Sequence, residues 1–198
     1  MRKIGLGALA IAIATIAAPA SGQIVSGTIN VSGTVAPKCQ VVSPGPASQS
    51  FLSTVDLGDI SRANGTLEDD GVLTARFNAG GTQVANLQFQ IVCTTAAPFV
   101  TVDADPILNG GGTAPTGYSA RVDYTSQVTL NLVNGGSQAV SNLSSAGAAS
   151  SQSLNARLVT GQNNLTVTAT GFTAGNASDV LVAGAYSGVI NITIAPST

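Results

Sequence analysis

In the stretch at residues 23–35, QIVSGTINVSGTV, the side chains from Val25 onward alternate strictly between two kinds. One parity carries only apolar residues or glycine: Val25, Gly27, Ile29, Val31, Gly33 and Val35. The other parity, from Ser26 to Thr34, carries only Ser, Thr and Asn. Alternation with a period of two predicts a β-strand with one apolar face, and the two glycines leave gaps in that face where a partner surface can approach. Such a strand either begins the chain's own sheet or docks in another molecule, and the pattern leaves both interpretations open.

The residues before this strand predict a secretory signal peptide. A positively charged start, MRK, leads into an apolar run at residues 4–18, and the small residues Ala18, Pro19 and Ala20 follow. The prediction places the signal peptide at residues 1–20, with cleavage near residues 20–22. The apolar run is too short for a membrane span, which needs about 20 residues. We therefore expect an exported mature protein with no membrane segment.

The charge and composition of the chain argue against several function classes. Charged residues make up 8% of the sequence, and without the two basic residues of the signal peptide five basic residues face nine acidic ones, a net charge of −4. The basic residues are scattered, so nothing predicts a nucleic-acid surface or a membrane-binding face. The abundant Gly, Ser, Thr, Asn, Val and Ala favour strands and turns within one domain.

The two cysteines, Cys39 and Cys93, both follow the export signal. In an oxidising compartment a single disulfide between them is the expected state. Residues 86–93 alternate so that Cys93 has the apolar, core-facing parity, as an inter-strand disulfide needs. Such a bond closes a loop of about 55 residues, which the chain-entropy model values at roughly 4 kcal/mol.

The rest of the chain consists of short alternating segments separated by turn residues. Strands are expected at residues 39–42, 51–60, 71–77, 86–93, 98–104, 118–124, 128–132, 165–169 and 186–194. The pair Asn134-Gly135 predicts a hairpin turn, and the Ser- and Ala-rich stretch at residues 141–153 predicts a long loop or a short helix. Frequent short strands without a helical period predict an all-β fold of the sandwich type.

The residue types needed for most catalytic chemistry are missing. There is no His, hence no His-based triad and no imidazole metal site. Acidic residues at 68–70 and at Asp103 and Asp105 could hold a hard cation such as calcium, but each run precedes Gly or Pro and is better explained as turn chemistry. The sequence therefore predicts no enzyme, no catalytic residue, no metal site and no cofactor.

Four sequence stretches, taken in their order and spacing along the chain, allow a comparison with a known protein family. The alternating strand leads to Cys39, FLSTVDLGDI occupies residues 51–60, a Gly-Gly pair and LQFQIVC end at Cys93, and AGAYSGVINITI occupies residues 183–194. In order and spacing these stretches resemble the spore coat protein U family, which includes the pilins of archaic chaperone–usher pili. The resemblance covers most of residues 23–195.

The resemblance implies an incomplete immunoglobulin-like β-sandwich that is completed by donor-strand exchange. Residues 34–198 would form the pilin-like domain, and residues 23–33 would be the N-terminal donor strand. The donor side would insert Val25, Gly27, Ile29, Val31 and Gly33 into a neighbour. The edge strand of the acceptor groove would present Tyr186, Ile190, Ile192 and Ile194. Because the sequence stops soon after residue 194, we expect no further strand to cover that edge.

The resemblance also implies partners and a location. The partners would be identical or related pilin subunits, a periplasmic chaperone and an outer-membrane usher, with export through the periplasm to the cell surface as part of a fimbrium. We therefore expect a structural subunit of a secreted surface fibre that supports adhesion or biofilm formation. The alternatives are a secreted monomeric β-sandwich binding module, closed by its own N-terminal strand, and a structural protein of a spore or cyst coat. A length sufficient for one domain favours a shaft or minor subunit over a tip adhesin.

Overall fold

The computed structural model describes residues 25–43, 45–81, 86–110 and 112–197. The predicted signal peptide, and residues 23 and 24 of the predicted donor strand, lie outside these ranges. The chain divides into two units, residues 1–34 and 35–198. In the first unit, residues 25–34 have neither strand nor helix structure, and the side chains of Val25, Ile29 and Val31 are at least 90% exposed. The alternating segment thus presents its apolar face without hydrogen-bonded strand structure.

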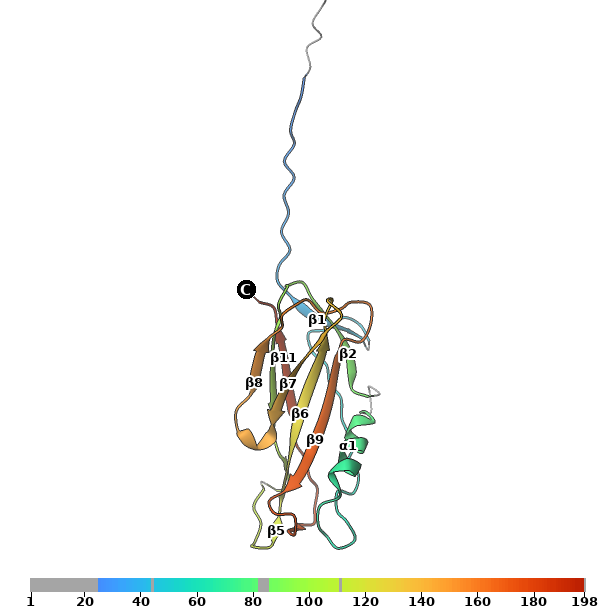
Figure 1. Ribbon diagram of the computed structural model, residues 1–198, viewed down its shortest axis with the longest axis vertical. Helices are drawn as coiled ribbons and strands as arrows, with labels where there is room; N and C mark the ends of the chain where they lie inside the picture. Colours follow the sequence, from blue (N-terminus) through green and yellow to red (C-terminus); the bar gives the residue numbers. More distant parts are fainter. Residues whose placement is uncertain (1–24, 44, 82–85, 111, 198) are drawn as a thin grey trace, which may run out of the picture. The chain divides into compact units, whose positions relative to one another are not determined.

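The larger sheet of the second unit is antiparallel and has six strands (Figure 1). Its hydrogen-bonded order is β1 (Cys39–Ser43), β2 (Gln88–Cys93), β9 (Leu165–Ala174), β6 (Arg121–Asn131) and β4 (Ile107–Leu108), and β7 (Ser137–Leu143) also pairs with β6. The long strands β6 and β9 form its centre.

The smaller sheet has three antiparallel strands. Its order is β11 (Ile190–Ala195), β3 (Phe99–Ala104) and β8 (Ser150–Ser153). A short parallel pair, β5 (Tyr118–Ser119) and β10 (Val180–Leu181), joins two loops elsewhere in the unit. The fold is therefore mostly β, as the sequence predicts.

One apolar core joins the two sheets. Val100 and Val102 of β3 and Val128 and Leu130 of β6 are fully buried, each at every second position of its strand. The alternate side chains of β6 are mostly Thr, Gln and Asn, which point away from the core. The period-two pattern of the sequence thus places one face of each of these strands in the core.

The hairpin predicted at Asn134-Gly135 is present between β6 and β7. Leu132 N donates to Gly136 O at 2.9 Å, and Asn131 lies opposite Ser137. Gly135 has a φ of +79°, which favours glycine at this position of the turn. The strands predicted at residues 98–104 and 165–169 are confirmed as β3 and the first half of β9.

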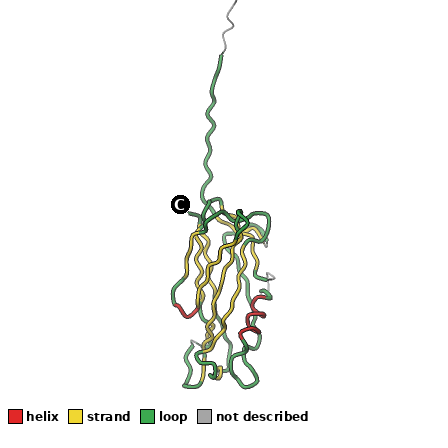
Figure 2. The backbone as a smooth tube through the Cα atoms, viewed as in Figure 1, coloured by secondary structure: helices red, strands yellow, loops and turns green. Residues whose placement is uncertain are grey.

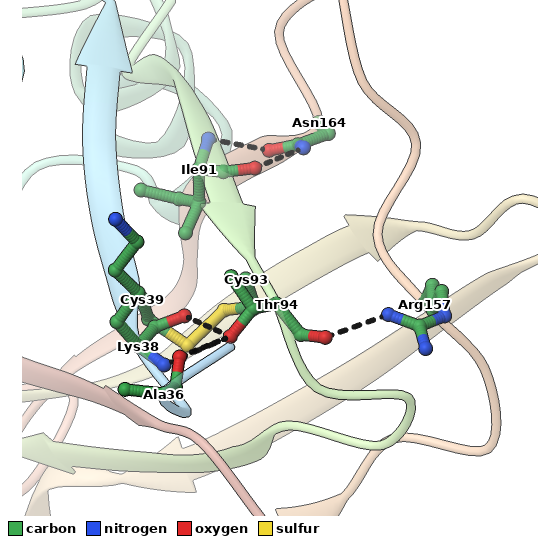
Figure 3. Close-up of a disulfide and its surroundings, with 8 residues drawn as sticks. All are labelled: Ala36, Lys38, Cys39, Ile91, Cys93, Thr94, Arg157 and Asn164. Carbon is green, nitrogen blue, oxygen red and sulfur yellow. Dashed lines mark hydrogen bonds between the residues drawn. A yellow bond between two sulfur atoms is a disulfide. The ribbon is translucent and has the colours of Figure 1, made fainter. Parts of the chain in front are cut away.

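The predicted disulfide between Cys39 and Cys93 is present (Figure 3). The two residues lie opposite each other in the β1–β2 pair, with Cα atoms 4.1 Å apart. Thr94, the residue after Cys93, adds two hydrogen bonds beside the disulfide. Its N donates to Lys38 O at 2.9 Å, and its O accepts from Arg157 Nη1 at 2.8 Å. The disulfide therefore joins neighbouring strands of one sheet.

The strand predicted at residues 71–77 is wrong, because these residues lie in α1 (Asp70–Asn78; Figure 2). Leu73 and Phe77 are four residues apart, so a helix places both on one face, and both are buried. Asp70 lies in the first turn, where a negative charge favours a helix. With two buried residues in nine, the stretch is too short to display a helical period.

Other boundaries also differ from the prediction. The strands predicted at residues 118–124 and 128–132 are β5 and one continuous strand, β6. Residues 141–153, predicted as a loop or short helix, contain the end of β7, a 3₁₀ turn at Ser144–Ala146 and the edge strand β8. The strand predicted at residues 186–194 begins only at Ile190, and Ser187 makes just an isolated bridge to Leu108. Among the described residues, neither helix has the length and apolar character needed to cross a bilayer.

Candidate functional site

Residues 51–60 form an extended segment that belongs to no sheet, and we call it the wall segment. The strand predicted here is wrong, because none of its residues takes part in a strand or bridge. The predicted alternation is nevertheless present: Phe51, Ser53, Val55 and Leu57 are half-buried, whereas Leu52, Thr54, Asp56 and Gly58 are exposed. The wall segment thus turns one face to the core without a strand neighbour.

β11 supplies a second unpaired edge. It pairs with β3 along its whole length, from Ile190 opposite Ala104 to Ala195 opposite Phe99. No other strand in the described ranges pairs with β11. Its apolar side chains, Ile190, Ile192 and Ile194, are only half-buried, although they pack against the core. An apolar row therefore borders an edge whose backbone is not paired.

The wall segment and β11 border a groove of about 1030 Å³, which we call the apolar groove. Residues 182–190 line it together with Ile192, next to the wall segment. Its floor consists of apolar and aromatic side chains from several elements: Phe77, Leu87, Phe89, Tyr124, Val167, Phe172 and Leu181. A second hollow, of about 240 Å³, shares Phe51 and Ile192 with the groove and extends it toward β1 and Ile194.

Three aromatic side chains of the floor, those of Tyr124, Phe172 and Phe77, lie next to one another. The rings of Tyr124 and Phe172 are stacked with centroids 5.5 Å apart, and Phe77 lies 6.4 Å from Phe172. Burial raises the pKa of Tyr124 above its usual range, and the negative charge of Asp105 adds to the effect. The phenol is therefore neutral throughout the physiological range, and the floor carries no charge at this point.

The wall segment is attached near both ends. The ring of Phe51 lies 4.4 Å from that of Phe89 of β2, measured between centroids. Toward the other end, Arg76 of α1 donates from Nη1 to Leu57 O at 3.0 Å and to Asp59 O at 2.6 Å. The backbone and hydroxyl of Ser61, together with the charge of Arg76, lower the pKa of Asp59.

The predicted edge residues of the acceptor side lie together around this groove. Ile190 and Ile192 line it, and Ile194 lines the adjoining hollow. Tyr186 also lines the groove but precedes β11, so its assignment to the strand is wrong. Its single O–H lies within hydrogen-bond distance of two backbone oxygens, Ser119 O at 3.0 Å and Val182 O at 2.9 Å, and this contact holds the loop leading into β11.

The described donor residues belong to the first unit, and the acidic run predicted as a possible cation site is used in ion pairs. Val25, Gly27, Ile29, Val31 and Gly33 are exposed in the first unit. Of the acidic run at residues 68–70, Glu68 and Asp69 form ion pairs with Arg62. Within the described ranges, no group of three or more acidic or Cys side chains is arranged to hold a metal ion.

The comparisons with known proteins add no relative. No family model, no curated protein and no solved structure matches this chain.

The sequence pattern identifies neither Arg76 nor the aromatic floor as part of a site. Arg76 carried no signal because its helix was predicted as a strand, and its two backbone acceptors are 17 and 19 residues away in sequence. The alternation at residues 118–124 did place Tyr124 on the apolar face, and this face points into the core. That the core is open beside Tyr124 depends on tertiary packing, which a local pattern does not encode.

Proposed function

We propose that this protein is a structural subunit of a secreted surface fibre, in which residues 23–33 of one copy fill the apolar groove of the next. The single observation that carries the proposal is the groove itself, bordered by β11 and the wall segment, neither of which has a strand partner on that side. In this proposal the body is an immunoglobulin-like β-sandwich that lacks one strand, and the strand is supplied by strand addition.

The dimensions of the groove support a strand as its occupant. An extended chain rises about 3.3 Å per residue, so the ten residues of the wall segment span about 33 Å at most. Nine donor residues, 25–33, span about 30 Å by the same measure. The donor is therefore long enough to run beside nearly the whole wall.

The chemistry of the donor also matches the groove. The segment carries no charge, and the groove floor is apolar and aromatic. Val25, Ile29 and Val31 are nearly fully exposed, and burial of such side chains contributes roughly 1.5–3 kcal/mol each. Gly27 and Gly33 on the same face have no Cβ, so the backbone can approach bulky floor residues there.

An unfilled groove requires protection before assembly. An exposed apolar edge pairs readily with other chains and is an aggregation hazard. A periplasmic chaperone that occupies the groove, and an usher that exchanges it for the next subunit, would remove this hazard. These partners, the fimbrial location and the role in adhesion or biofilm formation come from the resemblance to the spore coat protein U family.

Self-association of the exported protein tests the proposal. The full-length mature protein is purified from the periplasm, and its size is measured as a function of concentration by size-exclusion chromatography and by electrophoresis without boiling. We expect a ladder of head-to-tail oligomers that lengthens with concentration. A monomer at all concentrations, with residues 25–33 protected from amide exchange, would contradict the proposal and favour a self-closed binding module.

A further inference from the structure

Helix α1 connects the central sheet to the region of the groove. Asp70 Oδ1 accepts a hydrogen bond from Phe172 N at 2.8 Å, and Asn78 Oδ1 accepts one from Ala169 N at 3.3 Å. Both donors are backbone groups of β9, so the helix is fastened to that strand at both of its ends. Leu73, which is fully buried, fastens the middle of the helix. α1 therefore has a fixed position on the sheet.

Arg76 extends from this fixed helix to the wall segment. Its Nη1 donates to the carbonyl oxygens of Leu57 and Asp59, as described above. Within the described ranges, these are the only hydrogen bonds that join the backbone of residues 51–59 to another element. At the last residue of the wall, Ile60 O accepts a hydrogen bond from Glu68 N at 2.9 Å. Elsewhere the wall depends on side-chain packing, at Phe51, Val55, Leu57 and Ile60.

We propose that Arg76 is a positioning residue for strand uptake, which holds residues 57–59 of the wall where an incoming strand can pair with it. This inference rests on the proposed function, since it assumes that a strand enters the groove. A wall that leaves its position must be ordered again during binding. The apparent affinity for the strand then falls in proportion to the fraction of molecules whose wall is in place.

The guanidinium group suits this task. It is always charged at physiological pH, and its hydrogen bonds to carbonyl oxygens are charge-assisted. Its planar, rigid geometry lets one nitrogen serve two carbonyl groups two residues apart. A Lys side chain keeps the charge but presents it as a compact, flexible ammonium group, so Arg76→Lys tests the geometry separately from the charge.

The test uses the full-length mature protein with Ile29→Asp, which disables its own donor, and a synthetic peptide of residues 23–35. Peptide association and dissociation rates are measured by fluorescence anisotropy for this parent protein, which retains Arg76, and for its variants R76Q and R76K. The matched control is R62Q, which removes another cation; among the described residues its side chain pairs with Glu68 and Asp69, and it has no described hydrogen bond or ion pair with residues 51–59. Backbone order of residues 52–58 and 122–131 is measured by ¹⁵N relaxation.

We expect R76Q to slow peptide association about tenfold, the loss expected from one or two charged hydrogen bonds, with little change in dissociation. The association rate of R76K should lie between those of R76Q and the parent, and R62Q should bind the peptide at the same rate as the parent. Order should fall at residues 52–58 and remain unchanged at residues 122–131.

Three results would overturn the inference. Equal association rates for R76Q and the parent would mean that Arg76 does not position the wall. Reduced order at both residues 52–58 and residues 122–131 would mean that Arg76 only stabilises the fold, and R76K provides the same comparison if R76Q does not fold. Failure of the peptide to bind even the parent with Arg76 would reject the proposed function, and the inference with it.

Discussion

The ring of Phe51 packs against that of Phe89, with centroids 4.4 Å apart and planes tilted by 41°. Phe51 is the first residue of the wall segment, and Phe89 is a buried residue of β2. Both also line the apolar groove. Because the backbone of Phe51 has no described hydrogen bond to another element, this aromatic contact is the main attachment of the wall at that end.

Removing the Phe51 ring should therefore destabilise the body. Phe51→Ala should lower the free energy of unfolding by about 2 kcal/mol, less than for a fully buried Phe because the side chain is half-buried. The neighbouring Leu52, which is 73% exposed, is the matched control, and Leu52→Ala should change stability by less than about 0.5 kcal/mol. Urea denaturation of the two variants measures the difference, and equal effects would show that the ring contact does not hold the wall.

The disulfide between Cys39 and Cys93 should stabilise the fold by lowering the conformational entropy of the unfolded chain. Replacing both residues with Ser should cost roughly 4 kcal/mol in the chain-entropy model and reduce the yield of exported protein. Denaturation of the variant and of the reduced wild type should give similar losses. If both thiols of native, unreduced protein react with an alkylating reagent, the bond is not formed during export.

Asn164 should be the most sensitive polar residue of the core. It is fully buried; its Oδ1 accepts from Ile91 N at 2.9 Å, and its Nδ2 donates to Ile91 O at 2.7 Å and to Val159 O at 2.5 Å. Asn164→Ala leaves these backbone groups without partners and should cost about 3 kcal/mol or more. Asn163, its exposed neighbour, provides the control, since Asn163→Ala should change the unfolding free energy by less than about 0.5 kcal/mol.

The sequence predicts those parts of the fold in which apolar and polar residues alternate, and it does not predict the others. Alternating apolar residues identify strands that bury one face, and β3 and the first half of β9 were found in this way. The sequence does not predict β8, because SSQS has no apolar residue that could show an alternating pattern. Its pairing with β3 is visible only in the structure. α1 was missed because Leu73 and Phe77 are its only buried residues.

The candidate site was predictable in its parts but not as a site. The alternation of residues 51–60 and of residues 190–194 correctly placed their inward faces. That both segments lack a strand partner on the side of the groove follows from long-range pairing, which alternation does not report. A half-buried Ile192 and a fully buried Val102 have the same local pattern, and only tertiary structure distinguishes them.

The parity of the donor segment makes a prediction about assembly. Ile29→Asp should abolish the oligomer ladder, because it places a charge in an apolar groove at a cost of several kcal/mol. Val31→Asp should act in the same way, whereas Thr28→Asp and Asn30→Asp should assemble nearly as the wild type does. Electrophoresis without boiling compares the four variants. Equal damage from both parities would mean that the register, or the donor role itself, is wrong.

The last prediction is that a strand supplied in the same chain completes the fold. A copy of residues 23–33 is fused after Thr198 through a short turn containing Asn-Gly, and the native N-terminal segment is removed to prevent chaining. A tethered strand has an effective concentration in the millimolar range or above, so it should outcompete strands from other molecules. The fusion protein should be monomeric, unfold in one cooperative transition and resist denaturant far better than the unfused body.

A matched fusion protein tests whether the increase in stability comes from the donor strand entering the groove. The same protein with Asp at the position copied from Ile29 has the same length and turn, but it cannot bury the donor face without burying a charge. It should be about as stable as the unfused body, because an unfilled groove leaves Ile190 and Ile192 half-exposed as before. If both fusion proteins are more stable than the unfused body by the same amount, the added segment does not enter the groove. If neither gains, and the unmodified protein is already a stable monomer, the N-terminal segment closes its own sheet, and the protein acts as a self-contained module.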